Sequence, residues 1–267
     1  MTGRPLSLSH LTVLDAPPPL LVTAAGGAGF GAVGIRVWPA GDEPPYPMLD
    51  DTPVRRETLA RLADTGVRVL DVEVLRLLPD TTRDHCLRLL DAGRLLGARA
   101  VLVIGNDPDR ERLVDRYAEV CAAAGERGLR ACLESMIFSA VKTLADAVRL
   151  VEQAAHPAGA VLVDALHLRR AGGTPADVAA LAPDLLPYAQ LCDGPAAPVR
   201  PPEAVALAEA RSGRLLPGDG ELPLRALIDA LPADAALAVE APVTALAGEP
   251  VGVRARLAYE ALARTLG

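Results

Sequence analysis

The chain has 267 residues, of which 51% are hydrophobic, and a formal net charge of −7 at pH 7. This hydrophobic content can form one large core, and a barrel of alternating strands and helices with about 250 residues is a normal single domain. No block of basic residues with interleaved aromatic residues is present, and no apolar run reaches the roughly 18 residues that a membrane span needs. The composition therefore argues against nucleic-acid and membrane partners.

The amino terminus and the cysteines indicate the cellular compartment of the protein. We expect no signal peptide, because the first residues lead directly into a short strand-like run. The four cysteines are scattered and none forms a CxxC pair, which favours reduced thiols over a disulfide framework. These features predict a cytoplasmic protein.

Hydrophobic periodicity predicts an alternation of strands and helices along the chain. Strands are expected at residues 6–13, 32–37, 67–74, 98–105, 129–136, 160–163, 188–192 and 235–241. Helices are expected at 18–29, 54–65, 81–96, 110–127, 143–155, 175–185, 222–231 and 251–266, with loops at 38–53 and 193–221. Eight such units predict a (βα)8 TIM barrel that forms a single domain over residues 1–267. A doubly wound sheet is disfavoured, because no GxGxxG follows the first strand.

Oxygen-donor side chains stand at the ends of the last four predicted strands, where barrels of this type place their active sites. They are Glu134, Asp164, Gln190 and Glu240. Three converging carboxylates repel one another, and a divalent cation is the simplest compensation. The all-oxygen donor set predicts one divalent metal, with Mn²⁺ as first choice and Mg²⁺ or Co²⁺ as alternatives.

Other residues near strand ends are candidate substrate contacts. His167 follows Asp164 by three positions and can hydrogen-bond a substrate oxygen, although a lone histidine is often a plain loop residue. Arg214 lies in a basic, glycine-rich loop and can neutralise an oxyanion, a role that Arg211 could take instead. Each of the remaining candidates is weak evidence by itself. They are Arg36, Glu73, Asn106 and the single tryptophan, Trp38. For Trp38 a packing role is equally consistent.

The chain resembles the sugar phosphate isomerase/epimerase superfamily, the xylose-isomerase-like barrels. The resemblance covers nearly the whole chain and is most specific in LES at 133–135, VDALHLRRAGGTPAD at 163–177, YAQLCDG at 188–194, RLLPGDGEL at 214–222 and VEAP at 239–242. Members similar to tagatose and psicose epimerases bind one metal through Glu, Asp, His and Glu. The resemblance thus implies Glu134, Asp164, Gln190 and Glu240 as ligands, with Gln190 in place of the usual histidine, and Arg214 as the substrate-binding arginine.

The resemblance implies an isomerase or epimerase that acts on a small sugar, sugar phosphate or related polyhydroxy-ketone. A metal-stabilised enediolate would form, with Glu134 and Glu240 as acid and base. Expulsion of a β-hydroxyl from the same enediolate would instead make a dehydratase of the inosose or dehydroshikimate type. A non-catalytic ligand-binding barrel is a further alternative, whereas a nuclease is disfavoured by the four histidines and the negative charge. Relatives of this kind are often homodimers.

Overall fold

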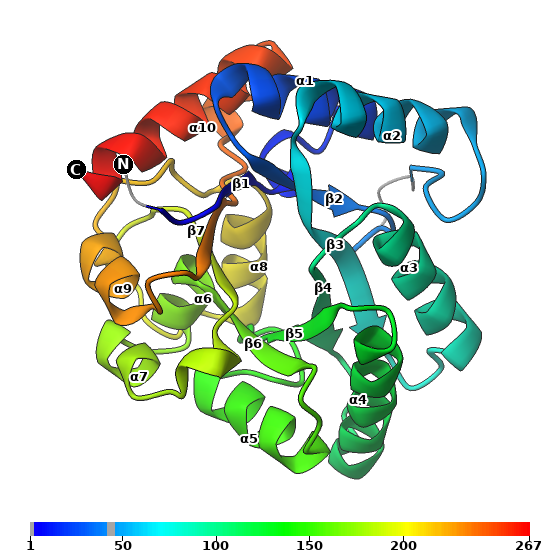
Figure 1. The fold of residues 1–267 in the computed structure, drawn as a ribbon. Helices are drawn as coiled ribbons and strands as arrows, with labels where there is room; N and C mark the ends of the chain where they lie inside the picture. Colours follow the sequence, from blue (N-terminus) through cyan, green and yellow to red (C-terminus); the bar gives the residue numbers. More distant parts are fainter. Residues whose placement is uncertain (1–2, 42–45) are drawn as a thin grey trace.

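Eight parallel strands form a closed barrel in the order β1 to β8, with helices on its outside (Figure 1). The computed structural model describes residues 3–41 and 46–267. The predicted (βα)8 TIM barrel is therefore confirmed. Part of the loop predicted at 38–53 lies outside the described residues.

The strands are β1 (Leu6–Leu8), β2 (Ala32–Arg36), β3 (Arg68–Leu77), β4 (Ala100–Gly105), β5 (Arg130–Glu134), β6 (Gly159–Asp164), β7 (Tyr188–Leu191) and β8 (Ala236–Val239). The helices are α1 (Pro18–Ala28), α2 (Pro53–Thr65), α3 (Arg83–Leu95), α4 (Arg110–Gly125), α5 (Leu144–Ala154), α6 (Ala165–Arg170), α7 (Pro175–Ala179), α8 (Glu203–Ser212), α9 (Leu224–Ala230) and α10 (Val251–Leu266). Three short 3-10 segments are η1 (His10–Val13), η2 (Pro183–Leu185) and η3 (Thr244–Leu246).

Several segments differ from the prediction. The first strand stops at Leu8 and continues as η1, because the buried His10 ring satisfies the Arg36 amide and the Ala16 carbonyl. The helix predicted at 175–185 is divided into α7 and η2. Two helices, α6 and α8, lie where the sequence indicated loops.

Local sequence determines where several helices begin. Thr143 starts α5 with a capping box, in which its hydroxyl accepts from the Asp146 amide and the Asp146 carboxylate accepts from the Thr143 amide. Thr174 and Asp177 form the same arrangement at α7. These caps satisfy amides that would otherwise have no partner at the helix start, so each helix begins directly after its capping threonine.

The strand register brings the predicted site residues to one end of the barrel. Asp164 pairs with Gln190 across β6 and β7, and Glu134 pairs with Leu162 across β5 and β6. Because all strands are parallel, their carboxyl ends form one mouth. The helices pack against the outer face of the barrel. The first helix, α1, lies beside the last, α10, where the ring of helices closes (Figure 1). All four cysteines are buried and unpaired, and no helix among residues 3–41 and 46–267 is long and apolar enough to cross a membrane.

His10 is a buried histidine that joins the first and second βα units. Its Nδ1 accepts from the Arg36 amide at 3.0 Å, so its Nε2 carries the proton and donates to the Ala16 carbonyl at 2.8 Å. Its ring also stacks on Tyr46, with centroids 5.3 Å apart. Burial lowers the pKa of His10 to about 4, because a charged ring would lose its hydration.

This lowered pKa predicts a pH-dependent contribution to stability. The unfolded chain binds a proton at His10 below its ordinary pKa of 6.5, whereas the folded chain does so only below about 4. The contribution is therefore complete above pH 6.5 and is lost as the pH falls towards 4, by about 3 kcal/mol over that interval. Chemical unfolding of wild type and His10→Gln across this range should show a steeper loss in the wild type. Parallel pH profiles of the two proteins would contradict the assignment.

Candidate metal and active site

Four buried oxygen-donor side chains meet at the carboxyl mouth of the barrel. Glu134 and Asp164 are the last residues of β5 and β6, Gln190 lies within β7, and Glu240 follows β8 directly. Each is at most 4% exposed. The Glu240 amide also donates to the Leu191 carbonyl at 3.0 Å, which fixes the end of β8 beside β7.

Arg214 is the cation at the centre of this group. Its Nη1 lies 2.6 Å from Asp164 Oδ2 and 3.2 Å from Glu240 Oε2, and it also donates to the Glu240 carbonyl at 3.0 Å. Its Nε donates to the Ala210 carbonyl of α8 at 2.9 Å. The side chain is 2% exposed. Two of the predicted metal ligands therefore share one buried guanidinium.

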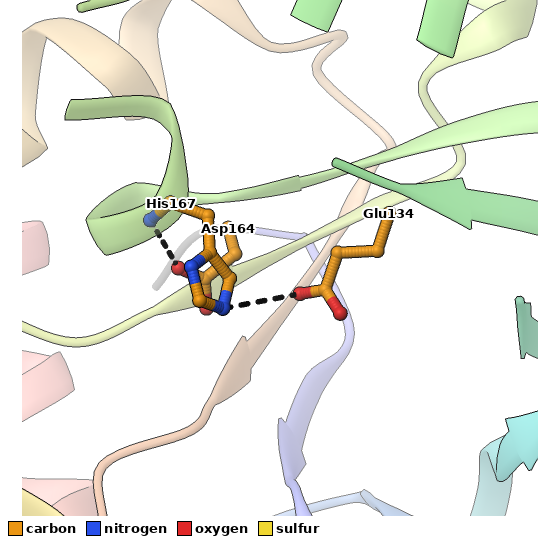
Figure 2. A group of neighbouring side chains, drawn as sticks. All are labelled: Glu134, Asp164 and His167. Atoms are coloured by element: carbon orange, nitrogen blue, oxygen red, sulfur yellow. Dashed lines mark hydrogen bonds and ion pairs between the residues drawn. The ribbon is translucent and has the colours of Figure 1, made fainter. Parts of the chain in front are cut away.

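His167 reaches the same group from α6. The Asp164 carboxylate caps this helix, because its Oδ1 accepts from the His167 amide at 2.8 Å. The ring Nε2 lies 4.0 Å from Glu134 Oε1 and 3.4 Å from Arg214 Nη2. A guanidinium offers only donors, so this Nε2 accepts and the ring proton is on Nδ1. Figure 2 shows the three side chains of Glu134, Asp164 and His167 turned toward one another.

The pKa values in this group follow burial and the position of Arg214. Burial and the neighbouring carboxylates raise the pKa of Glu134 well above its usual range. Burial also raises the pKa of Glu240, to about 8, despite the opposing charge of Arg214. For Asp164 the effect of burial is outweighed by Arg214, and its pKa is lowered. Burial lowers the pKa of His167 to about 4, so its ring is neutral near pH 7.

The donor set fits a divalent cation. Three carboxylates face one guanidinium, which leaves two negative charges if all are ionised. Glu134 Oε1 and Gln190 Oε1 are buried oxygens without a hydrogen-bond partner, and such atoms are costly unless a ligand satisfies them. One ligand atom each of Glu134, Asp164 and His167 also lie within 4.8 Å of one another, so this group could hold a metal.

A cavity of about 470 Å³ opens above these side chains. Four of the predicted substrate contacts line it: Arg36, Asn106, His167 and Arg214. Two others are not among the described residues on its wall. Glu73 is buried and pairs with Arg36 at 2.9 Å, and Trp38 packs edge-on against His85 with centroids 4.6 Å apart.

Arg211, the predicted alternative to Arg214, also lines the cavity. The structure adds two residues that were not among the candidates: Arg76 lines the cavity, and Phe138 lies edge-on to His167 with centroids 5.5 Å apart. Arg76 follows Glu73 on β3, which continues to Leu77, beyond the end predicted at 74. A longer third strand in the prediction would have directed attention to Arg76.

Asp193 holds the loop that presents Arg214. Its carboxylate accepts from the amides of Gly194, Gly218 and Leu222 at 2.8 to 3.0 Å. Its backbone also exchanges two 2.8 Å hydrogen bonds with Leu215, the neighbour of Arg214. Asp193 is 1% exposed. This buried aspartate therefore fixes the start of the loop and both sides of its turn.

The fold and the site together define a class of protein. Its members are parallel eight-stranded barrels with a buried cluster of carboxylates at the carboxyl ends of the strands. The family model described as the xylose isomerase-like TIM barrel matches residues 22–258. The chain belongs to this family.

One curated relative is a 3-dehydroshikimate dehydratase of Pseudomonas putida, 28% identical over 180 residues. The match covers 62% of this chain but spans only 28% of the relative. Among solved structures, an IolI protein with a bound zinc atom matches with a TM-score of 0.80 and 17% identity, over 100% of this chain and 98% of the other. The D-psicose 3-epimerase of Clostridium cellulolyticum H10, solved with D-tagatose, matches with a TM-score of 0.74 and 16% identity, over 100% and 98% of the two chains. At these identities the two structures show the common fold alone.

Substitution of Asp193 tests the support of the Arg214 loop. In Asp193→Asn, an amide NH₂ would face backbone N–H donors, so we expect a loss of about 1–3 kcal/mol in the free energy of unfolding. Asp219→Asn in the same loop is the matched control, because Asp219 is half-exposed and makes only a 3.4 Å contact with Arg264. Chemical denaturation measures both changes. Equal stability losses in the two variants would contradict the assigned role.

Proposed function

We propose that the protein is a metal-dependent dehydratase that removes water from a small cyclic hydroxy-ketone bearing a carboxylate, a substrate of the 3-dehydroshikimate type. The supporting observation is an asymmetry between the two candidate acid–base groups. Glu240 accepts from Gln190 Nε2 at 2.8 Å through one oxygen and contacts Arg214 Nη1 at 3.2 Å through the other. Glu134 Oε1 has no hydrogen-bond partner among the described residues.

An unpartnered carboxylate oxygen suits Glu134 for proton transfer. Glu134 would take the proton from the carbon alpha to the ketone, a double bond would form to the beta carbon, and the beta hydroxyl would leave. Glu134 would then return the same proton to the departing hydroxyl, which leaves as water. A single acid–base group therefore suffices for a balanced elimination. Burial and the neighbouring carboxylates raise the pKa of Glu134 well above its usual range, which makes this carboxylate a stronger proton acceptor.

The metal ligands in this proposal are Glu134, Asp164, Gln190 and Glu240. A divalent ion bound to them would supply positive charge that acidifies the proton alpha to a substrate carbonyl. His167, neutral near pH 7, would hydrogen-bond a substrate oxygen through its ring. Arg214 would keep Asp164 ionised and offset the remaining negative charge.

The cavity wall supports a cyclic carboxylate as substrate. Half of its larger side chains are apolar: Leu11, Leu14, Val74, Leu102, Ile104, Met136, Phe138 and Leu207. These side chains suit the body of a ring, and the polar side chains on the same wall would bind its hydroxyl, ketone and carboxylate groups. Arg76 and Arg211 line the same cavity, and guanidinium groups bind carboxylates in a paired geometry. The dehydratase relative acts, by its name, on a substrate of this kind.

An isomerase or epimerase that uses Glu134 and Glu240 as acid and base is the second candidate. It is favoured by the raised pKa of Glu240, about 8, because a carboxyl group that is protonated near neutral pH can act as the acid. Epimerisation needs both groups, since the proton leaves one face of the carbon and returns to the other. The same variants therefore distinguish the two reactions.

Glutamine at each glutamate position tests the choice. With Mn²⁺ at saturation and 3-dehydroshikimate as the probe, we expect Glu134→Gln to lower turnover by about 100-fold or more, because the proton acceptor is lost. Glu240→Gln should stay within about tenfold of wild type, because elimination needs one base. Turnover is measured by ultraviolet absorbance of the newly conjugated product, and metal content is measured for every variant.

Deuterium exchange and a sugar substrate complete the experiment. D-Tagatose epimerised by the wild type, with no elimination from 3-dehydroshikimate, would replace the dehydratase proposal with the epimerase. A Glu134→Gln variant that retains full turnover and full metal content would exclude Glu134 as the base. Exchange of the alpha proton in deuterated water, followed by NMR, reports the proton-transfer step in both cases.

The role of Gln190 as a ligand predicts metal affinities. Gln190→Leu should weaken Mn²⁺ binding by about tenfold or more, because it removes one donor. Gln190→His should raise the affinity for Zn²⁺ relative to Mn²⁺, because imidazole suits zinc. Competition with a chelating dye measures both, and His167→Asn is the control that should retain wild-type Mn²⁺ affinity. Loss of binding in His167→Asn with none in Gln190→Leu would instead identify His167 as the ligand.

A further inference from the structure

A second cavity, of about 650 Å³, lies at the end of the barrel opposite the candidate active site. Its wall contains the first residue of six strands: Ala32 of β2, Arg68 of β3, Ala100 of β4, Arg130 of β5, Tyr188 of β7 and Ala236 of β8. Because the strands are parallel, these residues form the amino-terminal mouth. The cavity is therefore separate from the one above Glu134 and Arg214.

Small side chains explain why this end of the barrel is hollow. Interior layers of such barrels are usually filled by bulky branched residues. Here Ala32, Ala100 and Ala236 are buried members of the interior layer. Tyr188 is fully buried, and its hydroxyl donates to Asp71 Oδ2 at 3.0 Å, deeper in the barrel. The cavity thus has an apolar floor with one aromatic ring.

Three arginines at the starts of neighbouring strands line the cavity: Arg68, Arg99 and Arg130. Backbone hydrogen bonds join the chain at this level, since the Arg130 amide donates to the Arg99 carbonyl and the Arg99 amide donates to the Leu70 carbonyl of β3. The Arg130 Nη2 donates to the carbonyls of Gly159 and Asp184, both at 2.8 Å, so neutral groups fix this guanidinium.

No acid forms an ion pair with these three arginines in the described part of the chain. Among the described residues, the Arg68 and Arg99 side chains make no hydrogen bond or ion pair. The carboxylates of Asp184 and Asp234 also line the cavity, yet neither lies within 4.0 Å of an arginine nitrogen among the described residues. Exposed arginines are usually just solvated, but here three of them border one cavity of ligand size.

We propose that this cavity binds a small organic carboxylate with a flat, ring-sized apolar body. The guanidinium groups of Arg68, Arg99 and Arg130 receive the carboxylate, as planar donors matched to its two oxygens. The alanine floor and the Tyr188 ring receive the body. The site is a binding site and takes no part in the reaction at the opposite mouth, so it stands whether or not the dehydratase proposal holds.

Benzoate is the probe, because it combines one carboxylate with one flat ring. Binding to the full chain is measured by isothermal titration calorimetry and by ligand-observed NMR, with metal removed by a chelator. We expect Arg68→Met/Arg99→Met to weaken benzoate binding by roughly tenfold or more. Ala236→Leu should block it by filling the floor. Arg256→Met is the control, because Arg256 is exposed on α10 and pairs with Glu260 at 3.3 Å.

Arg211→Met separates this site from the upper cavity, which Arg211 lines. Benzoate binding that survives Arg211→Met and is lost in the Arg68/Arg99 double variant supports the proposal. Binding that is unchanged in both the double variant and Ala236→Leu would overturn it, as would failure of the wild type to bind benzoate. Inorganic phosphate that binds as tightly as benzoate would overturn the assignment of a ring-bearing ligand.

Discussion

The burial of three carboxylates beside a single guanidinium is the constraint on which the active-site end of this barrel depends. Glu134, Asp164 and Glu240 leave water at the ends of their strands, and each lone charge there would cost several kcal/mol. Arg214 offsets part of this cost through its contacts with Asp164 and Glu240. If all three carboxylates are ionised, negative charge remains, and the group could hold a divalent ion that would complete the neutralisation.

Two of the outer helices, α6 and α8, help to hold Arg214 in place. The Arg214 Nε donates to the end of α8, and α8 is fixed to α6 by the Arg170–Glu209 pair at 2.7 Å. Helix α6 in turn starts on the Asp164 carboxylate, which also contacts Arg214. Asp164 is thus a candidate metal ligand, the cap of α6 and the partner of Arg214 at the same time.

The strands and the acids at their ends could be predicted from the sequence, because both are marked by residues that are neighbours along the chain. Apolar runs identify buried strands, and an acid that closes such a run stands out. Helices α6 and α8 could not be predicted in this way, because they depend on partners far along the chain. Arg170 and Glu209 are 39 residues apart, and neither residue indicates its partner by local pattern. The pairing of Glu73 with Arg36, 37 residues earlier, is hidden for the same reason.

The contacts of Glu240 bear on the choice between elimination and epimerisation, which family membership leaves open. A barrel of this family can place two glutamates around a substrate, and two equal groups would favour epimerisation. Here Gln190 brings an amide donor to Glu240, through its Nε2. That hydrogen bond and Arg214 engage both oxygens of Glu240, whereas Glu134 keeps one oxygen unpartnered. Gln190 on β7 therefore belongs to the proposed metal site and also occupies one oxygen of Glu240, the second candidate for proton transfer.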